Sequence, residues 1–220
     1  MRALRLLATA ALLLFSAPSF ATTFTVLGWD LGEVVKVQFN NQARSFWTVQ
    51  FHENVGGVVG TSFCADLSQT IGKAAYSNFV AHDPAAAENQ AFASGAPKRQ
   101  FVFAATIADK WGNSLGWLES TLGVTHVQAI TAVQAAVWEA VYGNAFSATS
   151  SSMSAGAFKA YQYVLGFKGY TGYGNTMLYY SRYNQDQLFT PPIPEPGAMF
   201  VFAAGALLVG HSLMRRRQQV

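Results

Sequence analysis

The chain of 220 residues has a single cysteine, Cys64. One cysteine excludes an internal disulfide and any cysteine-rich zinc site. Histidine is also scarce, and His52, His82 and His126 show no paired metal-ligand spacing. We therefore expect neither a metal nor another cofactor. In an oxidising compartment, a lone thiol must be buried, paired with another chain or chemically masked.

Charged residues are few as well, at 11% of the chain. The formal net charge is +3, but five of the fourteen basic residues lie close to the two ends, at positions 2, 5 and 215–217. Between residues 22 and 196, nine basic residues stand against all eleven acidic ones, a net charge of −2. This balance predicts no surface for binding nucleic acid.

The first 21 residues have the pattern of a secretory signal peptide. Arg2 and Arg5 are followed by an apolar run from Leu6 to Phe15, and small residues precede a cleavage point after Ala21. The apolar run is shorter than the roughly 20 residues that a membrane-spanning helix needs. We therefore expect residues 22–186 to be exported as one globular domain.

The C-terminal end has three parts in order. A proline-rich linker at 187–196 ends in Pro194, Glu195 and Pro196, and an apolar segment begins at 197 and leads to Arg215, Arg216 and Arg217 near the end of the chain. An apolar helix of about 18 residues followed by arginines predicts a membrane span with a cytoplasmic C-terminus. The whole tail, 187–220, resembles the PEP-CTERM sorting signal of Gram-negative bacteria. That resemblance implies an inner-membrane precursor that an exosortase-type enzyme processes and releases. An ordinary single-pass anchor is the alternative.

One helix, Thr125 to Tyr142, contains an unexpected glutamine. The segment has no Gly or Pro, and Thr125 with Gln128 forms a capping-box pattern at its start. Gln134 lies at the centre of the apolar stripe of this helix, which comprises Val127, Ile130, Val137, Trp138 and Val141. Burying an unpaired amide costs about 1–3 kcal/mol, so we expect Gln134 to have a hydrogen-bond partner or a covalent one.

Two short motifs resemble those of bacterial surface thioester domains. The segment from Gln134 to Trp138 resembles their Gln-x-Ala-(Ile/Val)-Trp motif, and Phe63-Cys64-Ala65 resembles their aromatic-Cys-apolar motif. The residue before the glutamine is Val133, where the family has Thr or Gln. The resemblance implies that the sulfur of Cys64 replaces the ammonia of the Gln134 amide and forms an internal thioester.

The resemblance also implies a function. A nucleophile on an amine-bearing surface or matrix target would attack the acyl carbon of Gln134, in a single-use reaction that is not enzymatic turnover. Phe63 and Trp138 would exclude water from the bond, and His126 or Glu139 could assist proton transfer. The alternative is a non-reactive structural protein of a biofilm or exopolysaccharide matrix, in which Gln134 is only hydrogen-bonded.

The order of the elements predicts an α+β fold. Alternating runs at 23–26, 34–39, 47–52 and 58–63 predict antiparallel strands, and Met177 to Tyr183 predicts a strand that returns to the sheet. Between them, helices are expected at 85–92, 101–111, 115–122, 125–142 and 153–167. We therefore expect an antiparallel sheet subdomain with an inserted helical subdomain.

Overall fold

The computed structural model describes residues 23–88 and 99–192. The predicted signal peptide, the apolar segment from 197 and the predicted sorting residues Pro194, Glu195, Pro196 and Arg215 to Arg217 lie outside these ranges. Among the residues that are described, no helix is long and apolar enough to cross a membrane.

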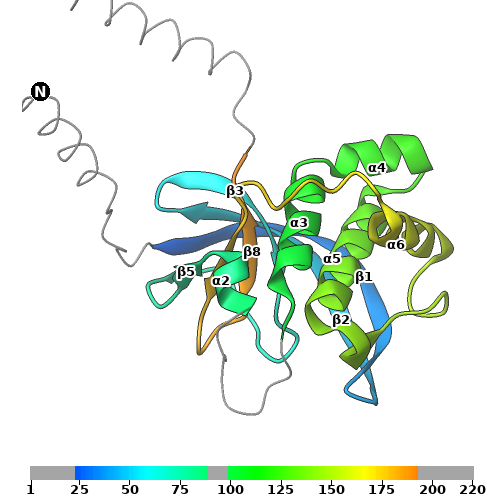
Figure 1. Cartoon of the computed structure of the whole chain (residues 1–220), viewed down its shortest axis with the longest axis horizontal. Coiled ribbons are helices and arrows are strands. Elements are labelled where there is room, and N and C mark those ends of the chain that lie inside the picture. The colour runs from blue at the N-terminus through cyan, green and yellow to red at the C-terminus, as the bar shows by residue number, and fades with distance from the viewer. Residues whose placement is uncertain (1–22, 89–98, 193–220) are drawn as a thin grey trace, which may run out of the picture.

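The described strands form one antiparallel, curled sheet, as the sequence predicted (Figure 1). Its order is β4-β1-β2-β3-β8-β7-β5, and β6 pairs with the far end of β1. The strands are β1 (Phe24–Phe39), β2 (Gln42–Val55), β3 (Val58–Cys64), β4 (Ala75–Tyr76), β5 (Val80–His82), β6 (Phe146–Ser147), β7 (Met177–Tyr180) and β8 (Gln187–Thr190).

A long hairpin of β1 and β2 is the base of this sheet. The two runs expected at 23–26 and 34–39 belong to one strand, because the pairing continues across irregularities between Val26 and Gly28 and between Leu31 and Val34. Such bulges let a strand bend and twist without ending. The hairpin turns at Asn40 and Asn41, both at positive φ, a conformation that asparagine adopts more readily than most residues.

The helices are α2 (Pro84–Glu88), α3 (Phe101–Gly112), α4 (Leu115–Leu122), α5 (His126–Tyr142) and α6 (Ala155–Gly166), with a 3-10 turn at Gly143–Ala145. Figure 1 shows α3, α5 and α6 side by side at one side of the sheet. The buried apolar side chains of helices and sheet belong to one cluster within the described ranges. The helices therefore share a core with the sheet and are not a subdomain with a core of its own.

Strand β8 corrects the domain boundary expected from the sequence. Residues 187–190 were assigned to the proline-rich linker, but they pair with β3 on one side and β7 on the other. All four are buried. Four residues are too few for strand periodicity to be distinctive, and the prolines that follow suggested an early end to the domain.

Helix α5 is fixed against the sheet near its N-terminal end. The predicted capping box is present, with Thr125 and Gln128 each bonding the other's main chain. One turn later the Thr131 hydroxyl accepts a hydrogen bond of 2.7 Å from the Glu33 main-chain N–H. A Cβ on Gly32 would lie 2.6 Å from that hydroxyl oxygen, so only glycine allows β1 to approach the helix this closely. These contacts set the position of Gln134 over β3.

Candidate functional site

The side chain of Gln134 on α5 binds Cys64 at the end of β3. Its Oε1 accepts a hydrogen bond of 3.0 Å from the Cys64 main-chain N–H, and its Nε2 donates one of 2.9 Å to the Cys64 carbonyl oxygen. Gln134 has no exposed surface and Cys64 is 3% exposed. The predicted partner of Gln134 is thus the cysteine, 70 residues earlier in the chain. The acyl carbon, bonded to both contacting atoms, is held beside Cys64.

A second contact holds the chain after Cys64 along the same helix. The Tyr142 hydroxyl, at the C-terminal end of α5, accepts a hydrogen bond from the Leu67 N–H and donates one to the Asp66 carboxylate. Eight helical residues rise about 12 Å, and three extended residues span about 10 Å. The segment from Cys64 to Leu67 therefore runs alongside the second half of α5, with a hydrogen bond at each end.

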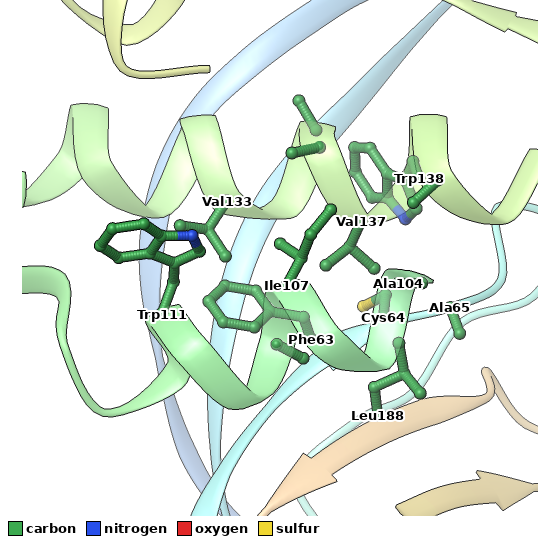
Figure 2. Packing of buried hydrophobic residues seen from close by; sticks show 14 of the residues in the cluster. Phe63, Cys64, Ala65, Ala104, Ile107, Trp111, Val133, Val137, Trp138 and Leu188 are labelled. Carbon is green, nitrogen blue, oxygen red and sulfur yellow. The ribbon is translucent and has the colours of Figure 1, made fainter. Parts of the chain in front are cut away.

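Apolar packing surrounds these two residues. Figure 2 shows Cys64 in a layer with Ala104 of α3, Val137 of α5 and Leu188 of β8. The motif neighbours Phe63 and Trp138 are 0% and 1% exposed. The Trp138 indole N–H finds no hydrogen-bond partner among the described residues. The burial of both aromatic rings agrees with the water-excluding environment that the sequence suggested, and it equally suits ordinary core packing.

The sulfur of Cys64 contacts a second glutamine, Gln187 on β8. Its Nε2 lies 3.8 Å from Sγ, and its Oε1 accepts a hydrogen bond of 3.0 Å from the Ser62 hydroxyl. Burial raises the pKa of the Cys64 thiol well above its usual range, and the Gln187 contact opposes that shift. In this environment the thiol is protonated at neutral pH, so forming a thiolate requires a specific stabilising group.

Glu53 on β2 is a buried acid in the same region. It has no exposed surface, and neither carboxylate oxygen has a hydrogen-bond partner within the described residues. Burial raises its pKa to about 8, an effect that the nearby Ser62 hydroxyl only partly offsets. Any charge on Glu53 also raises the pKa of Cys64. The carboxyl group is therefore largely neutral at pH 7.

A buried charged cluster lies next to the chain that follows Cys64. Arg99 lies 2.8 Å from the Asp186 carboxylate and 3.7 Å from that of Asp66, and both carboxylates are almost completely buried. Burial raises the pKa of Asp186 to about 7, opposed by a hydrogen bond from the Ser181 N–H and by Arg99. Burial alone would lower the pKa of Arg99, but Tyr142 and the two carboxylates raise it overall. This ion pair fixes the loops that follow β3 and precede β8.

The structure places the two proposed proton carriers away from the Cys64 contact. His126 lies at the first turn of α5 and pairs with Glu119 and Asp30. Eight residues separate it from Gln134, about 12 Å along the helix. Glu139 is rotated about 140° from Gln134 around the helix and accepts a hydrogen bond from Tyr161 of α6.

The arrangement can activate an amide for acyl transfer. Attack on the Gln134 acyl carbon places negative charge on Oε1, and the Cys64 N–H already donates a hydrogen bond to that atom. A main-chain donor aimed at a developing oxyanion stabilises the transition state, more strongly in a site without water. Among the described residues, no cluster of three or more His, Cys, Asp or Glu side chains is arranged to hold a metal ion.

Sequence reasoning missed the polar residues behind the sulfur. Glu53, Ser62 and Gln187 come from three different strands, and only sheet pairing brings them together. Glu53 carried a weak signal, since a charged residue on the buried side of an alternating strand is unusual. Gln187 carried none, because its segment was not recognised as a strand.

No family model matches the chain, and no curated protein matches it. Among solved structures, the chain is similar to the N-terminal thioester domain of a surface protein from Clostridium perfringens, with 13% identity over 78% of this chain and 100% of that one, and a TM-score of 0.47. A mutant of a C. perfringens surface-protein thioester domain, with one cysteine replaced by alanine, gives 12% identity over 66% of this chain and 89% of that one, with a TM-score of 0.44. The structural neighbours of this chain are thus thioester domains of a bacterial surface protein.

Proposed function

We propose that this is an exported surface or matrix protein that binds its target covalently through a thioester between Cys64 and Gln134. One observation carries the proposal: the Gln134 amide hydrogen-bonds both the N–H and the carbonyl of Cys64, the chain's single cysteine. The motif resemblance of the two segments supports it independently. Burial of both residues supports a bond that survives until a nucleophile reaches it.

The bond forms in one exchange at the acyl carbon. The Cys64 sulfur attacks the Gln134 acyl carbon, and the electron pair moves to Oε1, where the Cys64 N–H stabilises it. The carbon–nitrogen bond then breaks, and the thiol proton leaves with the nitrogen as ammonia. The product contains a carbon–sulfur bond and is lighter by one ammonia. No oxidant, metal or cofactor takes part.

Binding to a target reverses the roles of the groups. An amine on the target attacks the same acyl carbon, the carbon–sulfur bond breaks, and the amine proton passes to the Cys64 sulfur. The target is then joined to Gln134 through an amide, and Cys64 is a free thiol. Each molecule reacts once, so the protein is a covalent adhesin and not an enzyme.

Peptide mass measurement on the full chain tests this proposal. In the wild type, the peptides that contain Cys64 and Gln134 should remain joined and be lighter by one ammonia. Methylamine should separate them, leave a methylamide on Gln134 and release a thiol that reagents can label. Cys64→Ala is the matched control, because the small side chain keeps the packing while the nucleophile is lost. Unlinked wild-type peptides with an unmodified Gln134 would contradict the proposal.

A structural matrix protein is the second candidate. It is favoured by the same two hydrogen bonds, since they satisfy the Gln134 amide without any covalent bond. In that case Gln134 would fix the end of β3 to α5, and Cys64 would be an inert buried thiol. The two candidates differ in methylamine sensitivity, which only the thioester shows.

We further propose that an exosortase-type enzyme delivers the protein from the inner membrane to the surface, on the basis of the C-terminal pattern of Pro194, Glu195, Pro196 and the three arginines. Changing Glu195 to alanine should keep the precursor in the membrane and prevent release. Arg44→Ala, on the exposed part of β2, is a control that should leave release unchanged. Permanent membrane retention of the intact wild type would favour a plain anchor.

A further inference from the structure

We propose that Gln187 on β8 is a catalytic residue for forming and opening the thioester. Its side-chain N–H binds the Cys64 sulfur and stabilises it as a thiolate. The inference rests on the proposed function and adds a group that acts on the sulfur, where Gln134 supplies the acyl carbon. It concerns both the formation of the bond and its opening by an amine.

Sheet pairing puts Gln187 directly beside the sulfur. Cys64 and Gln187 are opposite each other in the antiparallel β3–β8 pair, so their side chains project from the same face. The Gln187 Nε2 lies 3.8 Å from Sγ, within the range of a hydrogen bond to sulfur. Gln187 has no exposed surface, so water does not compete for this contact. Cys64 is therefore contacted by two glutamines, one at its main chain and one at its sulfur.

Neighbouring groups determine which end of the Gln187 amide faces the sulfur. Nε2 also lies 3.3 Å from the Gln185 carbonyl oxygen, which can only accept a hydrogen bond. The Ser62 hydroxyl donates to Oε1 from the other side. The Gln185 carbonyl therefore requires the nitrogen end to point at Sγ, and the Ser62 hydroxyl, which can donate or accept, is compatible with that orientation. The sulfur is thus presented with a donor, and a donor favours a thiolate over a thiol or a thioester sulfur.

The environment of the sulfur makes this donor important. Burial is the main cause that raises the pKa of Cys64, and negative charge on Asp66 and any charge on Glu53 add to it, which disfavours the thiolate. The thiolate is both the attacking group when the bond forms and the leaving group when an amine opens it. A donor that binds the thiolate more strongly than the thioester sulfur lowers the barrier in both directions.

The proton and the electron pair balance in each direction. During formation the thiol proton leaves on the ammonia, and the sulfur electron pair forms the new carbon–sulfur bond. During opening that electron pair returns to sulfur, where the Gln187 N–H holds it until the proton of the attacking amine arrives. Gln187 itself neither gains nor loses a proton.

Methylamine kinetics on the full chain test the inference. Gln187→Met removes the donor while keeping the length of the side chain, and we expect about 10- to 100-fold slower opening, the range for one hydrogen bond to a charged group. Opening is followed in samples quenched with denaturant, by labelling the released thiol. Gln50→Met is the matched control, because Gln50 is also buried in the sheet but donates to the Gly112 carbonyl of α3. Its rate should equal that of the wild type.

Gln187→Leu provides a second test if the methionine variant folds poorly. Its side chain is apolar and offers no donor to the sulfur, so opening should again be slowed. A linked wild type with unchanged rates in folded Gln187 variants would overturn this inference and leave the proposed function standing. A wild type without the linked peptides would contradict the proposed function, and this inference with it.

Discussion

Helix α5 and strand β8 each place one completely buried glutamine against Cys64, and they do so in different ways. Gln134 of α5 binds the main chain of the cysteine, whereas Gln187 of β8 contacts its sulfur. The helix is 17 residues long with its own cap, while the strand has four residues and depends on β3 and β7 for its hydrogen bonds. A site built from both therefore joins a locally determined element to one that forms only within the sheet.

The comparison also separates two kinds of burial. Around Gln134 the neighbours are apolar, and the oxygen and the nitrogen of its amide each make a hydrogen bond. Around Gln187 the strands contribute Ser62 and the unpartnered acid Glu53. Buried polar groups without full partners cost stability and recur at sites that do chemistry. The free energy of unfolding should therefore depend on pH through Glu53, the buried acid near Gln187.

The largest expected effect comes from removing the helix glutamine. Gln134→Leu should abolish the linked peptides and all methylamine incorporation, because the acyl carbon is lost. It should also lower the free energy of unfolding by about 2–4 kcal/mol, since two buried main-chain groups of Cys64 lose their partners. Mass measurement and denaturant unfolding check the two effects. Full methylamine incorporation in this variant would show that another residue carries the acyl group.

Glu53→Gln should reveal how the free energy of unfolding depends on pH through the buried acid on β2. Burial raises the pKa of Glu53 from 4.5 to about 8, so the folded state binds a proton that the unfolded state releases. Its contribution to stability is fully present below pH 4.5 and is lost as the pH rises to about 8. Across this pH window the free energy of unfolding of the variant should therefore increase relative to that of the wild type, by roughly 3 kcal/mol at pH 7. Denaturant unfolding at several pH values measures the difference, and parallel curves would show that Glu53 has an ordinary pKa.

Ser62→Ala tests how far the Ser62 hydroxyl contributes to orienting the Gln187 amide. Without the hydroxyl, Oε1 of Gln187 loses its donor, which should cost about 1–2 kcal/mol of stability. Opening by methylamine should slow less than in Gln187→Met, because the Gln185 carbonyl still orients the amide. Thermal unfolding and the thiol-release assay give both values. A larger kinetic effect than that of Gln187→Met would mean that Ser62 acts on the sulfur independently.

Thr125→Ala should have the smallest effect. Losing the capping box of α5 should cost about 1 kcal/mol, with no change in the peptide link. The cap lies more than two turns from Gln134, and Thr131 still fixes the helix to β1. Thermal unfolding measures the loss. If the link were lost as well, the position of Gln134 would depend on the helix end and not on the contacts with the sheet.

Sequence reasoning found the elements with strong local signals. Helices α3, α4, α5 and α6 and the main strands lie close to their expected positions, and the returning strand β7 was expected. It missed the two-residue strands β4 and β6, the three-residue β5 and the four-residue β8. Short strands carry too few residues for periodicity to be seen, and distant parts of the chain provide their hydrogen bonds.

The sequence by itself determined that Gln134 would be buried and would need a partner. That follows from the 3.6-residue repeat of α5, which puts the amide at the centre of an apolar stripe whatever the rest of the fold. Only the tertiary structure decided that the partner is Cys64 and that Gln187 faces the sulfur. Both contacts join residues 70 or more positions apart, and they exist because α5 packs over β3 and β8 pairs beside it. Local propensity acts over a few residues, whereas strand pairing and helix packing depend on the entire core.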